Sequence, residues 1–380
     1  MKIAVPTETD PTETRVAATP ETVKKFVGLG ATVTVEAGAG AGSRILDADY
    51  EAAGATIAAD EAATLADADI VLKVRRPTQA ELGLMKRGAL VVGAIDPYGH
   101  EDAVQAMADA GVAAFAMEFM PRITRAQVMD ILSSQANLAG YQSVIDAAAN
   151  YGRALPMMMT AAGTVPAARV FVMGAGVAGL QAIATARRMG AVVTATDVRP
   201  AAKEQVESLG AKFVAVEDDE FRQAETAGGY AKEMSAEYRA KQAALVADHI
   251  RKQDIVITTA LIPGRPAPRL VSAEMVAAMK PGSVLVDLAV ERGGNVEGAR
   301  PGEVATVGDV KIVGYLNVPG RIAASASALY ARNLYAFVET MIDKANGTLA
   351  VNWDDELVKA TNLTRDGAVV HPAFAPKGGS

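Results

Sequence analysis

The chain has 380 residues, half of them apolar and about a fifth charged, and its formal net charge is −7. That length predicts two domains rather than a single core. Because basic residues are interspersed with acidic ones, we expect no binding to nucleic acid. The chain has no cysteine, which excludes disulfides, thiolate nucleophiles and cysteine-based metal sites, and we predict no metal centre.

Neither a leader nor a membrane span is expected. Residues 1–10 read as a strand followed by a polar loop, without the basic and then apolar stretches of a signal peptide. The longest nearly apolar run, residues 170–186, contains three glycines, and it is shorter than the roughly 20 residues of a spanning helix. We therefore expect a chain that is soluble in isolation.

Short apolar runs alternate with helical patterns from the first residue onward. This alternation predicts an α/β protein built from parallel βαβ units. In the first segment we expect helices at 19–30 and 100–111, each ending at a glycine. The strands are expected at 2–6, 31–37, 69–74, 89–95 and 113–119.

A long helix is predicted from 130 to 151, and it is followed by the second strand series, whose ranges are given below. After that series a second long helix is predicted at 321–345, where apolar residues recur at spacings of three and four. It should return to pack on the first domain. The strands of the second series are expected at 168–174, 191–197, 211–216, 254–260, 283–290 and 311–317.

These elements predict two Rossmann-like, doubly wound parallel-sheet domains linked by long helices, with a nucleotide in the cleft. The first domain would be discontinuous, formed by residues 1–132 plus 320–380. The second, residues 133–319, would bind the nucleotide.

The string GAGVAG, residues 174–179, follows an apolar strand and opens a helix. In that context it predicts a dinucleotide-binding turn, although glycines could also serve only a tight turn. Gly174 would permit the turn, Gly176 would let the pyrophosphate approach, and Gly179 would let the helix pack closely. The phosphates would lie at the helix N-terminus. We expect contacts along the whole string: Gly174, Ala175, Gly176, Val177, Ala178 and Gly179.

Asp197 ends the next strand and would bind the adenosine ribose hydroxyls, which favours NAD(H) over NADP(H). Arg199 leaves the preference for NAD(H) open, because an arginine there could tolerate a 2′-phosphate. Val198, between Asp197 and Arg199, is a further expected contact of the cofactor. Thr258, Ala260 and Leu261 follow another strand and are candidate neighbours of the adenine or nicotinamide, with core packing as the alternative for Leu261.

The polar stretch 218–242 is long for a connection and could be a lid. Gly228 and Gly229 could act as a hinge, and Tyr230 could close over the nucleotide. A solvated surface loop is the alternative interpretation.

The string RITRAQVMDILSS, residues 122–134, carries the other candidate site. On a helix, Gln127, Asp130, Ser133 and Ser134 would share a polar face spanning roughly 150°, with Arg122 and Arg125 preceding it. A solvated face with helix capping by Asp130 or a serine explains the same pattern.

This string, continued to Tyr141, resembles domain I of the proton-translocating NAD(P) transhydrogenases, the NAD(H)-binding alpha subunit. The resemblance extends over PMMMTAAGTVPAARVFVMGAGVAGLQAIATARRMGA, AETAGGYAKEM, TTALIPGRPAP, PGSVLVDLAVERGGN and TRDGAVVHP, and so over nearly the whole chain. It identifies the alanine dehydrogenases as a related family.

The resemblance implies a peripheral component, on the cytoplasmic side of the inner membrane, that binds NADH. Hydride would pass to NADP+ on a partner beta subunit (domain III), while a membrane-domain subunit moves protons. The resemblance also implies a homodimer. Arg122, Asp130 and Ser133 match the residues that hold the nicotinamide carboxamide, Gln127 matches the one that reaches toward the partner's nucleotide, and Tyr230 matches the loop tyrosine. The cofactor contacts expected on the same segments also include Arg125, Val128, Met129 and Gly229.

An alanine dehydrogenase is the first alternative. Arg15 and Lys73 match the residues that bind the substrate carboxylate in those enzymes, so they do not discriminate. Residues 89–99 lack the histidine that those enzymes use for catalysis, and Glu291 replaces their aspartate. His100, His249 and His371, the only histidines, are not placed to substitute for it.

The chemistry agrees with these departures. Oxidation of an amine or alcohol releases a proton that a base must take, whereas hydride transfer between two nicotinamides breaks one C–H bond and makes another. Such a site needs alignment and exclusion of water rather than a base. A non-catalytic NAD-binding regulatory subunit remains the second alternative.

Overall fold

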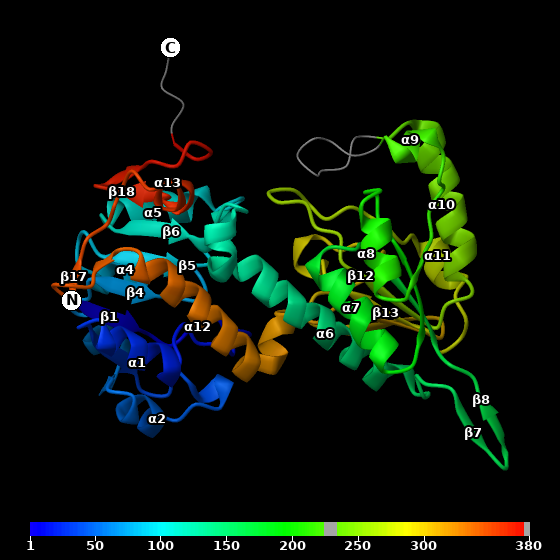
Figure 1. Ribbon diagram of the computed structural model, residues 1–380, viewed down its shortest axis with the longest axis horizontal. Coiled ribbons are helices and arrows are strands. Elements are labelled where there is room, and N and C mark those ends of the chain that lie inside the picture. Colours follow the sequence, from blue (N-terminus) through cyan, green and yellow to red (C-terminus); the bar gives the residue numbers. More distant parts are fainter. Residues whose placement is uncertain (224–233, 376–380) are drawn as a thin grey trace. The chain divides into compact units, whose positions relative to one another are not determined.

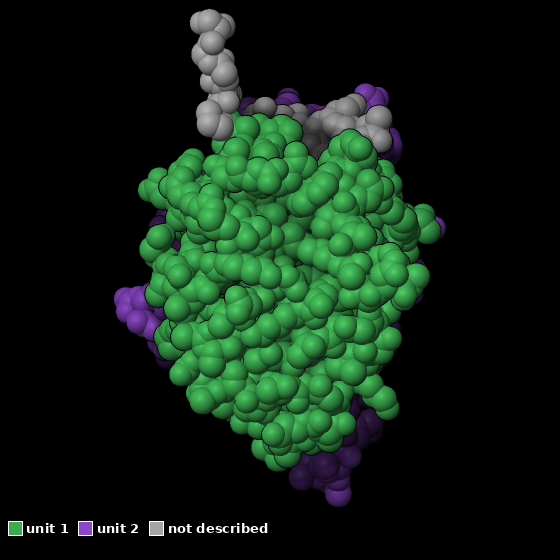
Figure 2. All heavy atoms as spheres, turned by 90° about the vertical axis from the view of Figure 1, so that its left-hand side faces the viewer, with its two compact units in different colours: residues 1–135, 319–380 green, residues 136–318 purple. Residues whose placement is uncertain are grey.

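The computed structural model describes residues 1–223 and 234–375, and the chain divides into two compact units (Figures 1 and 2). Unit 1 comprises Met1–Gln135 and Pro319–Ser380, and unit 2 comprises Ala136–Val318. The first division falls inside a long helix, α6 (Ile131–Tyr151), three residues after the boundary expected after residue 132.

Unit 1 is built on a parallel six-stranded sheet in the order β3-β2-β1-β4-β5-β6. Alternate strand residues point to opposite faces: Ile3 and Val5 join one apolar cluster, and Ala4 joins the other. Such double burial explains why these strands read as continuous apolar runs. The strands are β1 (Lys2–Val5), β2 (Thr32–Glu36), β3 (Thr56–Ala58), β4 (Ile70–Leu72), β5 (Leu90–Gly93) and β6 (Ala113–Ala116).

Helices cover both faces of this sheet. Phe26 of α1 and Tyr50 of α2 pack on one face with Leu334 and Phe337 of α12, so the last long helix does belong to unit 1. The opposite face is covered by α3, α4 and α5. The bounds are α1 (Pro20–Gly28), α2 (Asp47–Ala52), α3 (Glu61–Leu65), α4 (Gln79–Leu84), α5 (Glu101–Asp109) and α12 (Ala323–Glu339).

Shorter elements complete unit 1. The 3₁₀ turns are η1 (Ala41–Ser43), η2 (Met117–Phe119), η3 (Thr124–Met129) and η5 (Val318–Ile322), the last beginning one residue inside unit 2. After α12 come the hairpin β16–β17 (Ile342–Asp343, Thr348–Leu349), the helix α13 (Glu356–Thr361) and the hairpin β18–β19 (Thr364–Arg365, Ala368–Val369).

Unit 2 contains a seven-stranded sheet in the order β11-β10-β9-β12-β13-β15-β14, in which only β14 is antiparallel. Ala182 and Ile183 of α7 pack on one face, and Val246 and Ile250 of α10 on the other. The strands are β9 (Arg169–Met173), β10 (Val192–Thr196), β11 (Lys212–Phe213), β12 (Ile255–Thr258), β13 (Val284–Asp287), β14 (Val304–Val307) and β15 (Val310–Val313).

The helices of unit 2 include most of α6, together with α7 (Val177–Arg188), α8 (Ala202–Ser208), α9 (Asp219–Arg222), α10 (Ala236–Ile250), α11 (Ala273–Ala277) and the 3₁₀ turn η4 (Val290–Arg292). An exposed hairpin, β7–β8 (Met158–Thr160, Gly163–Val165), extends from this unit (Figure 1). Within the described residues no helix combines the length and apolar character that crossing a membrane requires.

The expected α/β class with two Rossmann-like parallel sheets is confirmed, and three details differ. The strand expected at 211–216 shortens to Lys212–Phe213. The helix expected at 321–345 ends at Glu339, and Ile342–Asp343 pair instead in a hairpin. The strands β3, β7, β8, β14, β17, β18 and β19 were not expected, because short edge strands and hairpins carry little apolar periodicity.

Candidate nucleotide-binding site

The glycine turn lies where β9 passes into α7, at the carboxyl end of β9, which lies between β10 and β12 in the sheet of unit 2. Gly174 has φ +108°, and a Cβ there would lie 2.5 Å from Thr259 Oγ1. A Cβ at Gly179 would lie 1.8 Å from the Gly174 carbonyl oxygen. Both positions therefore require glycine, the first for the turn and the second for close packing of α7.

Gly176 differs from its two neighbours in the string. A Cβ there would meet no protein atom within 4 Å, so the open backbone at this residue is not explained by packing. Gly176 is the N-cap of α7 and is exposed, and helix N-termini offer N–H groups to anions. The turn therefore fits the pyrophosphate of a dinucleotide.

Asp197 follows β10 and reaches back to this turn. The Ala175 N–H donates to Asp197 Oδ2 at 2.7 Å, and Arg199 Nε donates to Asp197 Oδ1 at 3.0 Å. Arg199 Nη2 also donates to the Ala175 carbonyl oxygen at 3.2 Å. Arg199 thus pairs with the carboxylate, while the adjacent Val198 is 59% exposed.

The expected nucleotide neighbours at the end of β12 differ in their exposure to solvent. Thr258 is fully buried and its hydroxyl donates toward β13, so its side chain lies in the sheet. Leu261 is 54% exposed, and core packing does not account for it. The Ala260 N–H donates to Asn295 Oδ1 at 3.0 Å, and Asn295 Nδ2 donates to the Ala260 carbonyl oxygen at 2.9 Å. Asn295, which the sequence did not single out, therefore fixes this loop.

The segment 122–134 is not one continuous helix, which corrects the expected shared face. Thr124–Met129 form the 3₁₀ turn η3, the backbone at Asp130 is extended (φ −77°, ψ 94°), and α6 begins at Ile131. Gln127 therefore lies on a different element from Ser133. Gln127 and Arg122 are exposed, and Asp130 and Ser133 are half-buried.

Asp130 caps α6. Its Oδ1 accepts the Ser133 N–H at 2.9 Å, and its Oδ2 accepts the Ser133 hydroxyl at 2.5 Å. A carboxylate at the N-terminus of a helix satisfies helix N–H groups that otherwise lack partners. Capping and ligand binding are compatible here, because a carboxylate can accept further hydrogen bonds.

Other residues of the segment anchor it within unit 1. Arg125 binds Asp355 through both terminal nitrogens, at 2.7 and 2.9 Å, and Glu356 at 3.2 Å. Met129 is buried in the apolar core, whereas Val128 is 63% exposed. Arg125, expected as a cofactor contact, is therefore engaged with the first turn of α13.

Buried charges follow the carboxyl ends of β1 and β4 in unit 1. Lys73, fully buried, lies 2.5 Å from Glu81 and 3.3 Å from Glu8. Arg15 binds Glu13 in a bidentate pair and donates to Gln135 Oε1 at 2.8 Å. The two residues that match a carboxylate-binding site thus contact acidic groups of the chain itself.

Ionisation in this cluster follows from these pairs. Burial alone would raise the pKa of Glu13, but Arg15 and Arg75 lower it to about 2. Burial would likewise lower the pKa of Lys73, and Glu8 and Glu81 raise it. Glu13 and Lys73 are therefore both charged at neutral pH, whereas burial raises the pKa of Glu8 despite the nearby Lys73.

None of the three histidines lies in the 122–134 segment or the glycine turn. His100 Nδ1 lies 3.0 Å from the Asp96 carbonyl oxygen, His249 Nε2 lies 2.8 Å from Thr194 Oγ1, and His371 stacks on Phe119. Glu291 accepts the Asn317 N–H at 3.3 Å. Gly228, Gly229 and Tyr230 lie outside the described residues.

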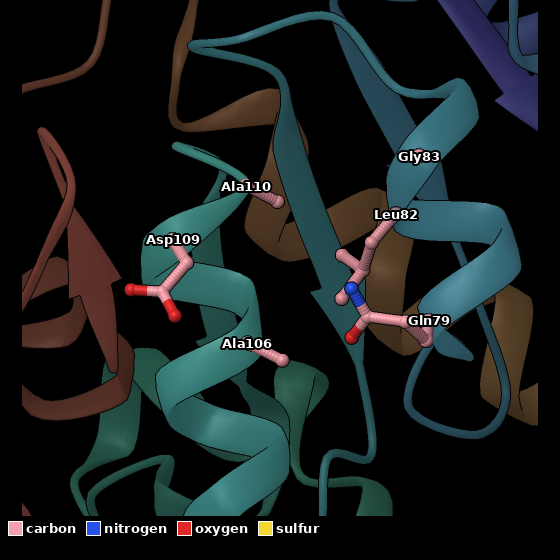
Figure 3. Close-up of a pocket in the computed structure, with 6 residues that line it drawn as sticks. All are labelled: Gln79, Leu82, Gly83, Ala106, Asp109 and Ala110. Carbon is pink, nitrogen blue, oxygen red and sulfur yellow. The ribbon is translucent and has the colours of Figure 1, made fainter.

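A shallow pocket of about 330 Å³ lies between α4 and α5 (Figure 3). Its lining contains none of the expected site residues: it consists of Gln79, Leu82, Gly83, Ala106, Asp109 and Ala110.

Known proteins match both units of this framework. Residues 4–139 match the family described as alanine dehydrogenase/PNT, N-terminal domain, and residues 143–372 match the corresponding C-terminal domain. NAD(P) transhydrogenase subunit alpha, first part, of Rhodospirillum rubrum is 57% identical over 383 residues, which cover 100% of both chains. The protein of the same name from Rickettsia prowazekii is 47% identical and covers 98% of this chain and 96% of its own.

Solved structures agree with these sequence relatives. A transhydrogenase from Sinorhizobium meliloti has a TM-score of 0.90 and 66% identity, covering 97% of this chain and 100% of that one. An L-alanine dehydrogenase has a TM-score of 0.83 and 26% identity over 98% of both chains. Alanine dehydrogenase of Mycobacterium tuberculosis is 34% identical over 304 residues, which cover 79% of this chain and 76% of that one.

Proposed function

Because the chain belongs to the alanine dehydrogenase/PNT family and matches transhydrogenase alpha subunits over its full length, we propose that it is the NAD(H)-binding component of a proton-translocating transhydrogenase. Hydride passes directly between NADH on this chain and NADP+ on a beta subunit. The reaction requires that partner, is Re/Si-specific, and is coupled to proton movement by a membrane-domain subunit.

The observation that carries the proposal is full-length similarity in a chain whose glycine turn is open at Gly176. The turn holds the pyrophosphate and Asp197 binds the adenosine ribose. Val177, Ala178, Val198, Ala260 and Leu261 are further proposed contacts of the nucleotide. Arg122, Asp130 and Ser133 hold the nicotinamide carboxamide, and Gln127 faces the partner's nucleotide.

When bound, NADH supplies a hydride from its nicotinamide ring, and the transfer leaves no proton to be taken up. The chain's residues act by holding the ring and excluding water. This division of roles agrees with a segment that carries an arginine, an amide, a carboxylate and a hydroxyl group but no histidine.

We also propose a homodimer at the cytoplasmic face of the membrane. The β7–β8 hairpin supports self-association, because its apolar side chains are exposed to solvent: Met158 is 43% exposed, Met159 76% and Val165 40%. Light scattering of the wild type and Met159→Lys tests this: a dimer weakened by the lysine supports the hairpin, and a monomeric wild type contradicts the dimer.

The decisive experiment mixes the purified chain with an NADP(H)-binding domain and follows reduction of an NAD analogue by NADH or NADPH. Turnover only in the mixture is expected. No turnover with a competent partner would refute the proposal. Oxidation of NADH by pyruvate and ammonia, with this chain alone, would replace it with an amino-acid dehydrogenase, and binding without transfer would indicate a regulatory module.

Calorimetric titration separately tests the nucleotide preference. We expect NADH to bind more tightly than NADPH, because a 2′-phosphate would approach the Asp197 carboxylate. Tighter binding of NADPH would show that Arg199 dominates this position.

A further inference from the structure

One buried amide side chain joins the two halves of the 122–134 segment. Asn333 lies on α12 and is 7% exposed. Its Nδ2 donates to the Val128 carbonyl oxygen at 2.7 Å, and its Oδ1 accepts the Ser134 hydroxyl at 2.7 Å. A single side chain thus bonds to η3, which carries Gln127, and to the first turn of α6, which carries Ser133.

The backbone needs such a contact at this point. Because the chain is extended at Asp130, the backbone hydrogen bonds on either side meet at that residue: its N–H donates to the Gln127 carbonyl oxygen at 3.5 Å, and its carbonyl oxygen accepts the Ser134 N–H at 3.2 Å. An asparagine has one donor group and one acceptor group, so it can bind both sides at once. An aspartate would present an acceptor to the Val128 carbonyl oxygen, and an apolar residue would remove both bonds.

Asn333 is itself held by a buried network. Gln135 Nε2 donates to Ser134 Oγ at 3.2 Å and to the Ala326 carbonyl oxygen at 3.2 Å, and Gln135 Oε1 accepts from Arg15. One turn earlier on α12, the Tyr330 hydroxyl donates to the Lys73 carbonyl oxygen at 2.9 Å. The same face of α12 therefore fixes the segment and the charged cluster.

From this geometry we infer that Asn333 is a positioning residue for hydride transfer. It touches neither nucleotide in the proposed function, on which this inference rests. It holds the backbone beside Gln127, so that the Gln127 amide and the Asp130–Ser133 cap keep a fixed separation. Misplacement of about 1 Å in a reacting assembly can cost on the order of 100-fold in rate.

The test uses Asn333→Ala, with Asn362→Ala as the matched control. Asn362 is also a buried asparagine of unit 1, and it donates to the carbonyl oxygens of Thr364 and Ala114 at 2.9 and 3.2 Å. Transfer in the reconstituted complex should slow by roughly 10- to 100-fold in Asn333→Ala while NADH affinity stays within about twofold. The control should lower the melting temperature without slowing transfer.

Two further readouts separate positioning from loss of fold. Hydrogen exchange of the amides of residues 124–130 should accelerate in Asn333→Ala and not in Asn362→Ala. In a Gln127→Ala background, Asn333→Ala should slow transfer by less than about twofold, because the two residues act through one effect. If Asn333→Ala fails to fold, Ser134→Ala, which removes one of the two bonds, should show the same pattern with a smaller effect.

The outcomes are distinguishable from those of the proposed function. A wild type that never transfers hydride refutes the function, and exchange in residues 124–130 then reports only whether Asn333 holds the backbone of this segment. Unchanged exchange in Asn333→Ala, or a loss of rate that adds fully to that of Gln127→Ala, would overturn the positioning role.

Discussion

In unit 1 and in unit 2, the first strand of the large sheet lies beside a point where the strand order reverses, between β1 and β4 and between β9 and β12. In unit 2 this point carries a glycine turn with open space at Gly176. In unit 1 it carries Glu8, Lys73 and Arg15 in buried pairs. Such points are where open α/β sheets bind ligands.

The difference shows how one topology serves two purposes. Glycines leave the backbone of unit 2 accessible, whereas the charges of unit 1 satisfy one another. Breaking a buried pair leaves an uncompensated charge and costs more than breaking an exposed one. We therefore expect changes at the unit 1 point to alter stability, and changes at the unit 2 point to alter nucleotide binding.

The largest expected effect is that of Lys73→Met, which leaves Glu8 and Glu81 buried without their cation. It should lower the free energy of unfolding of unit 1 by about 3–5 kcal/mol. The only tryptophan, Trp353, lies in unit 1 and stacks on Phe115, so its fluorescence in a denaturant titration reports this unit.

The matched control is Lys344→Met, which breaks an ion pair whose lysine is 61% exposed. Its cost should be about 0–1 kcal/mol. Equal stability of Lys73→Met and the wild type would mean that the buried charges do not hold unit 1 together.

Gly176→Ala should have the next largest effect. Because a Cβ there meets no protein atom, the melting temperature should not change. NADH affinity, measured by calorimetry, should fall on the order of tenfold or more, since the methyl group would occupy the approach of the pyrophosphate. Gly83→Ala, at another open glycine, is the control, and equal NADH affinity in both variants would argue against the site.

The smallest expected effect concerns pH. Burial raises the pKa of Glu118 to about 7, although the N–H groups of Ile95 and Asp96 donate to it. The folded state thus binds this proton more tightly than the unfolded state. Its contribution to stability is fully present below the unfolded value of 4.5 and is lost as the pH rises through about 7.

Trp353 fluorescence in denaturant titrations at pH 6 and at pH 8 measures this contribution. Glu118→Gln should flatten the loss of unit 1 stability between these values, a difference on the order of 1–2 kcal/mol. An unchanged slope in the variant would show that another group titrates.

The sequence predicts local features of the site well. The roles of Gly174 and Gly179 are predictable from the GAGVAG string, because the turn and the close helix packing that require glycine lie within one strand, turn and helix. The sequence also predicts the two long helices, α6 and α12, and apolar spacing at three and four residues identifies α12. The absence of a histidine from the 122–134 segment also follows directly from the sequence.

Contacts between distant segments were not predictable from spacing. Asn333 lies 205 residues after Val128, and Arg125 lies 230 residues before Asp355. The break at Asp130 is hidden because a 3₁₀ turn and an α-helix share similar spacing over six residues. Asp197 was predicted as a nucleotide ligand, but its pairing with Arg199 depends on side-chain direction.

The return of α12 to unit 1 also sets the order in which the chain can fold during synthesis. All residues of unit 2 precede residue 319, so that unit can form while the C-terminal segment is still in the ribosome. Unit 1 has all six sheet strands by residue 116, yet Tyr330 and Asn333 are made more than two hundred residues later. The 122–134 segment therefore acquires its fixed shape last, and a truncated chain would carry a finished glycine turn together with an unfinished 122–134 segment.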